Sequence, residues 1–147
     1  MNYKMIQSVN ILTTDNFVED AVGVLQKGGY SKPLIVTDEF MAGTDLMKAF
    51  LNKITDAGLQ YCIFDSVKPD PVILTVDNGY EVYAEESCDA VFAIGGGSVL
   101  DVARGINILA HNGGKIISYI EGKAVKHSPG LISVPTTSGT GSELSNA

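Results

Sequence analysis

Three consecutive glycines stand between an apolar run and a helical pattern, and their position suits them to binding chemistry. Gly95–Gly97 lie within the segment FAIGGGSVLDVARG (92–105). Glycine lets backbone N–H groups approach a ligand without a Cβ in the way. A helix starting here favours an anion such as a diphosphate, and we expect Ser98 as its N-cap with Asp101 completing a capping box. The segment does not match the G-x-G-x-x-G fingerprint, so a tight turn without a ligand is the alternative.

A carboxylate follows a second apolar run. Asp38 ends LIVTD (34–38), which has the β-branched composition of a buried parallel strand. An acidic residue at such a strand end accepts hydrogen bonds from both hydroxyls of an adenosine ribose and repels a 2′-phosphate. This favours NAD over NADP as a ligand. The alternative is a turn or capping residue in the loop before Thr44.

A third segment, VPTTSGTGSE (134–143), is dense in hydroxyl groups and glycine. Its donors and acceptors suit a nucleotide lying across the ends of the strands. It is not a Walker A loop, because no Gly-Lys-Ser/Thr follows the glycines. A polar surface loop is the alternative. The residues concerned are Thr136, Thr137, Ser138, Gly139, Thr140 and Gly141.

The remaining reactive residue types give no catalytic pattern. His111 and His127 lack a second ligand at metal-like spacing, and no Ser–His or Cys–His pair stands out. We expect Cys62 and Cys88 to be buried, reduced core residues. The formal net charge of −7 disfavours nucleic-acid binding. With no apolar run of about 18 residues and no visible signal peptide, these features predict a cytoplasmic protein without a membrane partner.

The elements that must position these residues alternate between short apolar runs and helical patterns. This alternation predicts an α/β fold with a mainly parallel sheet and helices on both faces. We expect one domain over residues 1–147, and the end of the chain resembles the start of another helix, which suggests a fragment. Extended segments are expected at 4–12, 34–38, 60–65, 89–94 and 131–135, and helices after Asn16, after Thr44, over about 72–86 and over about 98–110. Asn16 and Glu19 resemble a capping pair for the first helix. Thr44 is a candidate cap for the second, which carries Leu46 on its apolar side.

These motifs together resemble the N-terminal domain of iron-containing (group III) alcohol dehydrogenases, over essentially the whole chain. GGGSVLDVARG resembles the family's GGGS-x-x-D-x-A-K segment, and PTTSGTGSE resembles its most diagnostic string. LIVTD and FDSVKPDP fall in the expected order and at the expected distance. Two residues depart from the pattern: Asp70 stands where many relatives carry Asn, and Arg104 replaces the frequent Lys.

The resemblance implies the Rossmann-like N-terminal half of a two-domain enzyme with a dehydroquinate-synthase-like fold. Asp38 would meet the adenosine ribose, Asp101 would lie near the nicotinamide, and the glycine turn would hold the pyrophosphate. The metal ligands, one Asp and three His, belong to a C-terminal helical domain and have no counterpart here. The motifs and the resemblance together give these candidate cofactor contacts: Asp38, Asp70, Gly95, Gly96, Gly97, Ser98, Asp101, Thr136, Thr137, Ser138, Gly139 and Thr140.

The expected function is therefore the dinucleotide-binding part of an NAD-dependent, metal-dependent alcohol dehydrogenase acting on a small alcohol or diol. The complete enzyme would use Fe²⁺ or Zn²⁺, and this chain alone is expected to be inactive. Two alternatives remain: a glycerol-type or glycerol-phosphate-type dehydrogenase or NAD-using synthase of the superfamily, and a stand-alone, non-catalytic nucleotide-binding module. Residues 4–12 are expected to form an exposed sheet edge at which two copies pair into a dimer.

Overall fold

The computed structural model describes residues 10–68, 73–126, 128–136 and 143–146. Its sheet has the strand order β1-β6-β5-β4-β2-β3. β5, β4, β2 and β3 run parallel, whereas β6 is antiparallel to both β5 and β1. The prediction of a mainly parallel sheet is confirmed. The strands are β1 Asn10–Thr13, β2 Pro33–Val36, β3 Cys62–Phe64, β4 Ala90–Gly95, β5 Leu131–Pro135 and β6 Glu143–Asn146.

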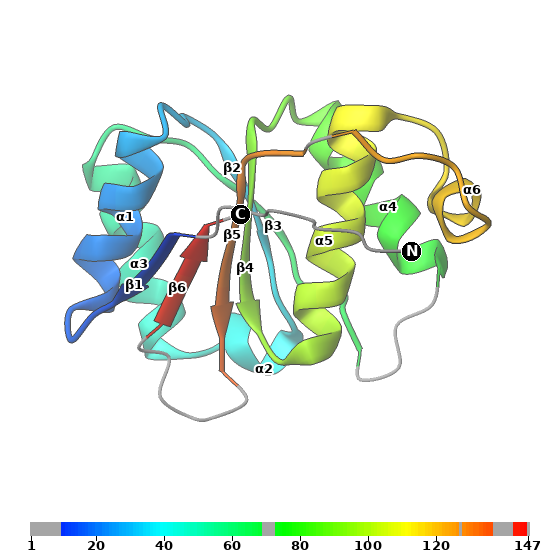
Figure 1. Cartoon of the computed structure of the whole chain (residues 1–147). Coiled ribbons are helices and arrows are strands. Elements are labelled where there is room, and N and C mark those ends of the chain that lie inside the picture. Colours follow the sequence, from blue (N-terminus) through cyan, green and yellow to red (C-terminus); the bar gives the residue numbers. More distant parts are fainter. Residues whose placement is uncertain (1–9, 69–72, 127, 137–142, 147) are drawn as a thin grey trace.

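Helices cover both faces of the sheet, with α1 and α3 on one side and α4 and α5 on the other (Figure 1). Alternating strand residues point to opposite faces. Ile35 and Phe92 pack on the α1–α3 side, while Leu34 and Val91 pack on the α4–α5 side. The predicted layers are confirmed. The helices are α1 Phe17–Lys27, α2 Glu39–Ala42, α3 Asp45–Asp56, α4 Ile73–Glu85, α5 Gly97–Asn112 and α6 Ile116–Ile120.

Local signals set several of the helix ends. The Thr44 side chain caps α3 by accepting a hydrogen bond from Met47 N at 3.2 Å, as predicted. The predicted capping pair of Asn16 and Glu19 is wrong, because Asn16 occupies the N-cap position of α1 but its side chain makes no capping hydrogen bond. Thr14 Oγ1 instead accepts from Asn16 N at 2.8 Å. A side chain that can bond locally to a turn need not be the one that does.

Three further expectations need correction. Residues 143–146 form the strand β6 rather than the start of a helix, because both β1 and β5 supply a pairing edge. Leu46, expected on the apolar side of α3, is 42% exposed. The short helices α2 and α6 were not expected at all. The first extended segment is confirmed as β1 from Asn10, at one edge of the sheet, and the nine residues before it lie outside the described part of the chain.

None of the helices in the described ranges has the length and hydrophobicity that a membrane crossing requires.

Candidate functional site

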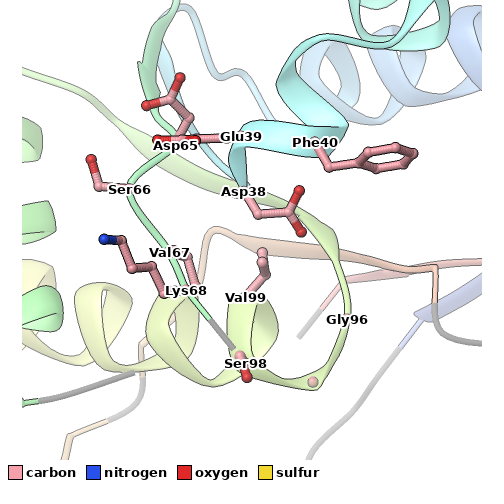
Figure 2. Close-up of a pocket in the computed structure, with 11 residues that line it drawn as sticks. Asp38, Glu39, Phe40, Asp65, Ser66, Val67, Lys68, Gly96, Ser98 and Val99 are labelled. Carbon is pink, nitrogen blue, oxygen red and sulfur yellow. The ribbon is translucent and has the colours of Figure 1, made fainter. Parts of the chain in front are cut away.

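A pocket of about 430 Å³ opens where β2, β3 and β4 end (Figure 2). In open α/β sheets, ligands bind at the carboxyl ends of the strands, where loops leave a crevice. Thr37 helps to hold these ends together, since its buried hydroxyl donates to Ile94 O at 2.8 Å. The lining residues are Asp38, Glu39, Phe40, Asp65, Ser66, Val67, Lys68, Gly96, Gly97, Ser98 and Val99.

The glycine turn joins β4 to α5, and its glycines serve different purposes. A Cβ at Gly95 would lie 2.7 Å from Val99 Cγ2, so that glycine is required by packing inside the turn. A Cβ at Gly97 would meet no protein atom within 4 Å. Because Gly97 lines the pocket, the space beside it is space that a ligand can use.

The predicted capping box at this turn is wrong. Gly96, not Ser98, is the N-cap of α5, and it makes no side-chain capping bond. Asp101 instead forms an ion pair with Arg104 at 3.6 Å. A glycine N-cap has no side chain of its own with which to accept a hydrogen bond from the helix start. The start of this 16-residue helix is a position that suits an anion.

Asp38 takes the capping role and also lines the pocket. It is the N-cap of α2, where Oδ1 accepts a hydrogen bond from Met41 N at 2.7 Å. The same carboxylate lines the pocket beside the glycine turn. An ionised carboxylate has about four acceptor positions, so one capping bond leaves capacity for a ligand's hydroxyl groups.

The hydroxyl-rich segment begins against the glycine turn. Pro135 lies opposite Gly95 in the pairing of β5 with β4, and Thr136 N donates to Gly95 O at 3.0 Å. The structure therefore brings two motifs together that are about forty residues apart in sequence, as one ligand spanning both would require. Asp70, Thr137, Ser138, Gly139 and Thr140 lie outside the described residues.

Several pocket residues were not singled out from the sequence. Asp65 follows β3 directly, so the rule that drew attention to Asp38 after β2 would have found it too, whereas Lys68 lies three residues further on. Glu39 and Phe40 belong to α2, a four-residue helix too short to produce a periodic pattern. Their place in the pocket had no signal in the sequence.

His111 and the two cysteines are not among the residues that line this pocket. His111 Nε2 lies 2.6 Å from Pro129 O, and His127 is outside the described part of the chain. Cys62 and Cys88 are free thiols; Cys88 is buried as predicted, but Cys62 is half-buried. Burial raises the pKa of Cys88 to about 12 and is also the main cause that raises the pKa of Cys62. Within the described ranges, no three His, Cys, Asp or Glu side chains gather closely enough to hold a metal ion.

Comparison with curated proteins finds dehydrogenases and reductases among the matches. The chain is 41% identical over 123 residues to an NAD-dependent methanol dehydrogenase of Bacillus methanolicus, covering 83% of this chain and 32% of that protein. It is 34% identical over 135 residues to a lactaldehyde reductase of Escherichia coli strain K12, covering 87% and 35%. The chain thus spans about a third of the length of these curated relatives.

Solved structures agree with the sequence comparison. The sulfoacetaldehyde reductase of Bifidobacterium kashiwanohense, solved in complex with NAD⁺, matches with a TM-score of 0.81 and 28% identity, covering 97% of this chain and 38% of that one. The sequence model of the family described as iron-containing alcohol dehydrogenase matches residues 9–147. The match extends over nearly the whole chain and includes both motifs that meet at the pocket. The chain belongs to the iron-containing alcohol dehydrogenase family.

Proposed function

We propose that this chain binds NAD and is the dinucleotide-binding part of an NAD-dependent, metal-dependent alcohol dehydrogenase. One observation carries the proposal: a single pocket is lined both by Asp38 after β2 and by the start of α5 at Gly96–Ser98. The carboxylate matches a ribose diol, and the helix start matches a diphosphate. The structural likeness to a reductase solved with NAD⁺ supports this choice of ligand.

The residue roles follow from these positions. Gly96, Gly97 and Ser98 would hold the diphosphate, and Asp38 would accept hydrogen bonds from the adenosine ribose. Asp101 would lie toward the nicotinamide, although its carboxylate already pairs with Arg104. The further contacts proposed from the motifs are Asp70, Gly95, Thr136, Thr137, Ser138, Gly139 and Thr140.

The described residues of the pocket suit a dinucleotide. A Cβ at Gly97 would occupy open space beside the helix start, which is the space that a diphosphate needs. The described residues offer no cluster of three metal-ligating side chains. We propose that residues 1–147 form the NAD-binding domain, and that the Fe²⁺ or Zn²⁺ of the complete enzyme is held by a separate C-terminal helical domain.

In the complete enzyme, a hydride would pass between a small alcohol or diol and the nicotinamide. NAD supplies the hydride acceptor when it is bound; the residues of this chain bind and orient it. The names of the relatives, a methanol dehydrogenase and a lactaldehyde reductase, support small alcohols and aldehydes as substrates. We expect the 147-residue chain alone to lack dehydrogenase activity.

We also propose a cytoplasmic location and a homodimer. Two cysteines without a disulfide suit a reducing compartment. β1 lies at the edge of the sheet, and an edge strand can pair with that of a second copy. The acidic charge of −7 gives no support for a nucleic-acid partner or for an anionic membrane surface.

The test is calorimetric titration of the chain and of Asp38→Asn with NAD and with NADP. Asparagine keeps a good N-cap side chain for α2 but removes the charge. We expect NAD to bind the wild-type chain in clear preference to NADP. In the variant, NAD binding should weaken about tenfold, as for a lost charged hydrogen bond. The difference between the affinities for NAD and NADP should become smaller.

Asp56→Asn is the charge-matched control, because Asp56 lies at the far end of α3, outside the pocket. It should leave both affinities unchanged. Equal binding of NAD and NADP by the wild-type chain would remove the role assigned to Asp38. No binding of either dinucleotide would contradict the proposed function.

A further inference from the structure

A large aromatic side chain stands in solvent at the rim of the pocket. Phe40 is 83% exposed, more than any other large apolar side chain among the described residues, and it lines the pocket together with Asp38 and the glycine turn. Scattered exposed apolar residues are ordinary and need no explanation. Exposure at the mouth of a ligand pocket is different, because a bound molecule would cover the ring.

The backbone ties Phe40 closely to Asp38. Met41 N donates to Asp38 Oδ1 at 2.7 Å, and Ala42 N donates to Asp38 O at 3.0 Å. Gly43 N closes the turn on Phe40 O at 3.2 Å. Figure 2 shows the Asp38 carboxylate and the Phe40 ring both leaving the start of α2 on the same side of the view. The position of the ring relative to the carboxylate is therefore set by α2.

The chemistry of an adenosine places its base next to the same ribose. The 2′-hydroxyl sits on the carbon adjacent to C1′, which carries the adenine. A ribose held by Asp38 therefore places the adenine close to that carboxylate, near the start of α2. Phe40 offers the flat apolar surface at that place, and aromatic side chains stack on bases irrespective of sequence because every base has a π-face.

The charges of Glu39 and Asp65 lie away from the ring. Both side chains line the pocket, but Figure 2 shows them on the opposite side of the start of α2 from the Phe40 ring. The ring itself therefore offers an apolar surface, which suits a neutral base better than a phosphate. Lys68 and the start of α5 supply the positive potential elsewhere in the same pocket. A ligand with a neutral base at one end and a diphosphate further along matches this distribution.

We propose that Phe40 stacks on the adenine ring of the bound dinucleotide and so recognises the adenosine half of the cofactor. The proposal rests on the proposed function, since it needs NAD in this pocket. It assigns Phe40 a binding role for any ligand that carries adenosine. It assigns none toward nicotinamide mononucleotide, which lacks the adenine.

The chain contains no tryptophan, so Phe40→Trp places a single fluorescent reporter at the rim. We expect titration with NAD or ADP-ribose to change its emission, and nicotinamide mononucleotide to leave it unchanged. Calorimetry of Phe40→Ala should show NAD and ADP-ribose binding about tenfold more weakly, in the range of a lost base–aromatic stack. The affinities of Phe40→Leu for NAD and ADP-ribose should lie between those of the wild-type chain and those of Phe40→Ala.

The matched control is Leu74→Ala, which shortens another exposed apolar side chain, at 63% exposure, outside the pocket lining. It should leave every affinity unchanged, and thermal unfolding should show that all variants remain folded. Unchanged NAD affinity in Phe40→Ala would overturn the stack and leave the proposed function standing. A change of oligomeric state without a change of affinity would identify Phe40 as a protein contact and also overturn it. Failure of the wild-type chain to bind NAD and ADP-ribose would overturn both proposals.

Discussion

At the scale of single residues, Gly95 and Gly97 of the glycine turn differ in what surrounds them. A Cβ added at Gly95 would lie 2.7 Å from Val99 Cγ2, whereas a Cβ added at Gly97 would lie in open space in the pocket. Both belong to one sequence motif, and nothing in that motif distinguishes them. Their packing environments show that one glycine serves the protein's interior and the other leaves room for a ligand.

Substitution by alanine should separate these two roles. Gly95→Ala should lower the free energy of unfolding by about 1–3 kcal/mol, because the added methyl group overpacks the turn. Gly97→Ala should leave stability equal or slightly higher, since alanine is the better helix former. It should nevertheless weaken NAD binding by crowding the diphosphate. Urea unfolding and calorimetric titration measure the two effects. Equal destabilisation by both substitutions, with unchanged NAD affinity in Gly97→Ala, would contradict this assignment.

Asp38 shows why residue roles are hard to divide from sequence. Its position at a strand end predicts either a ribose contact or a cap, and the structure gives it the cap while leaving it in the pocket. The cap uses one acceptor position of the carboxylate, and the proposed ribose contact would use others. For this reason Asp38→Asn, which keeps the capping oxygen, is more informative than a truncation to alanine.

At the scale of elements, most of the sheet and the long helices could be predicted from the sequence. β2 and β4 are continuous apolar runs buried on both faces, a pattern typical of parallel strands. Helix starts were less predictable, because several polar side chains near a start compete for the same N–H groups. Thr44 caps α3, but Asn16 does not cap α1, and Gly96 replaces Ser98 at α5.

The capping difference predicts a difference in stability. Thr44→Ala should lower the free energy of unfolding by about 1 kcal/mol, the typical value of a lost side-chain cap. Asn16→Ala should change it by much less, since Asn16 makes no capping bond. Chemical denaturation of both variants against the wild-type chain checks the comparison. Equal losses in the two would mean that Asn16 caps α1 in solution.

The elements missed by sequence reasoning have a common physical cause. α2 and α6 have four and five residues, so neither completes two turns of a periodic apolar pattern. The four residues of β6, ELSN, lack the strict alternation of apolar and polar residues that predicts a strand. Pairing partners supplied by β1 and β5 make it a strand. Such tertiary pairing overrides local propensity.

At the scale of the whole molecule, the site depends on segments distant in sequence. β2 contributes Asp38, the segment after β3 contributes Lys68, β4 and α5 contribute the glycine turn, and β5 brings Thr136 against that turn. The sequence motifs indicate candidate binding residues, and the parallel sheet explains why they meet, since the strands end at one edge. The proposed function requires that one ligand contacts these segments together.

The most direct test is the shift of backbone amide signals of the ¹⁵N-labelled 15.6 kDa chain on titration with NAD. We predict that the amides of Gly97, Ser98 and Thr136 shift together with one dissociation constant, while His111 at the far end of α5 does not move. Shifts that leave these three amides unchanged and gather instead in the hollow between α1 and α3, around Glu19 and Lys53, would contradict the account.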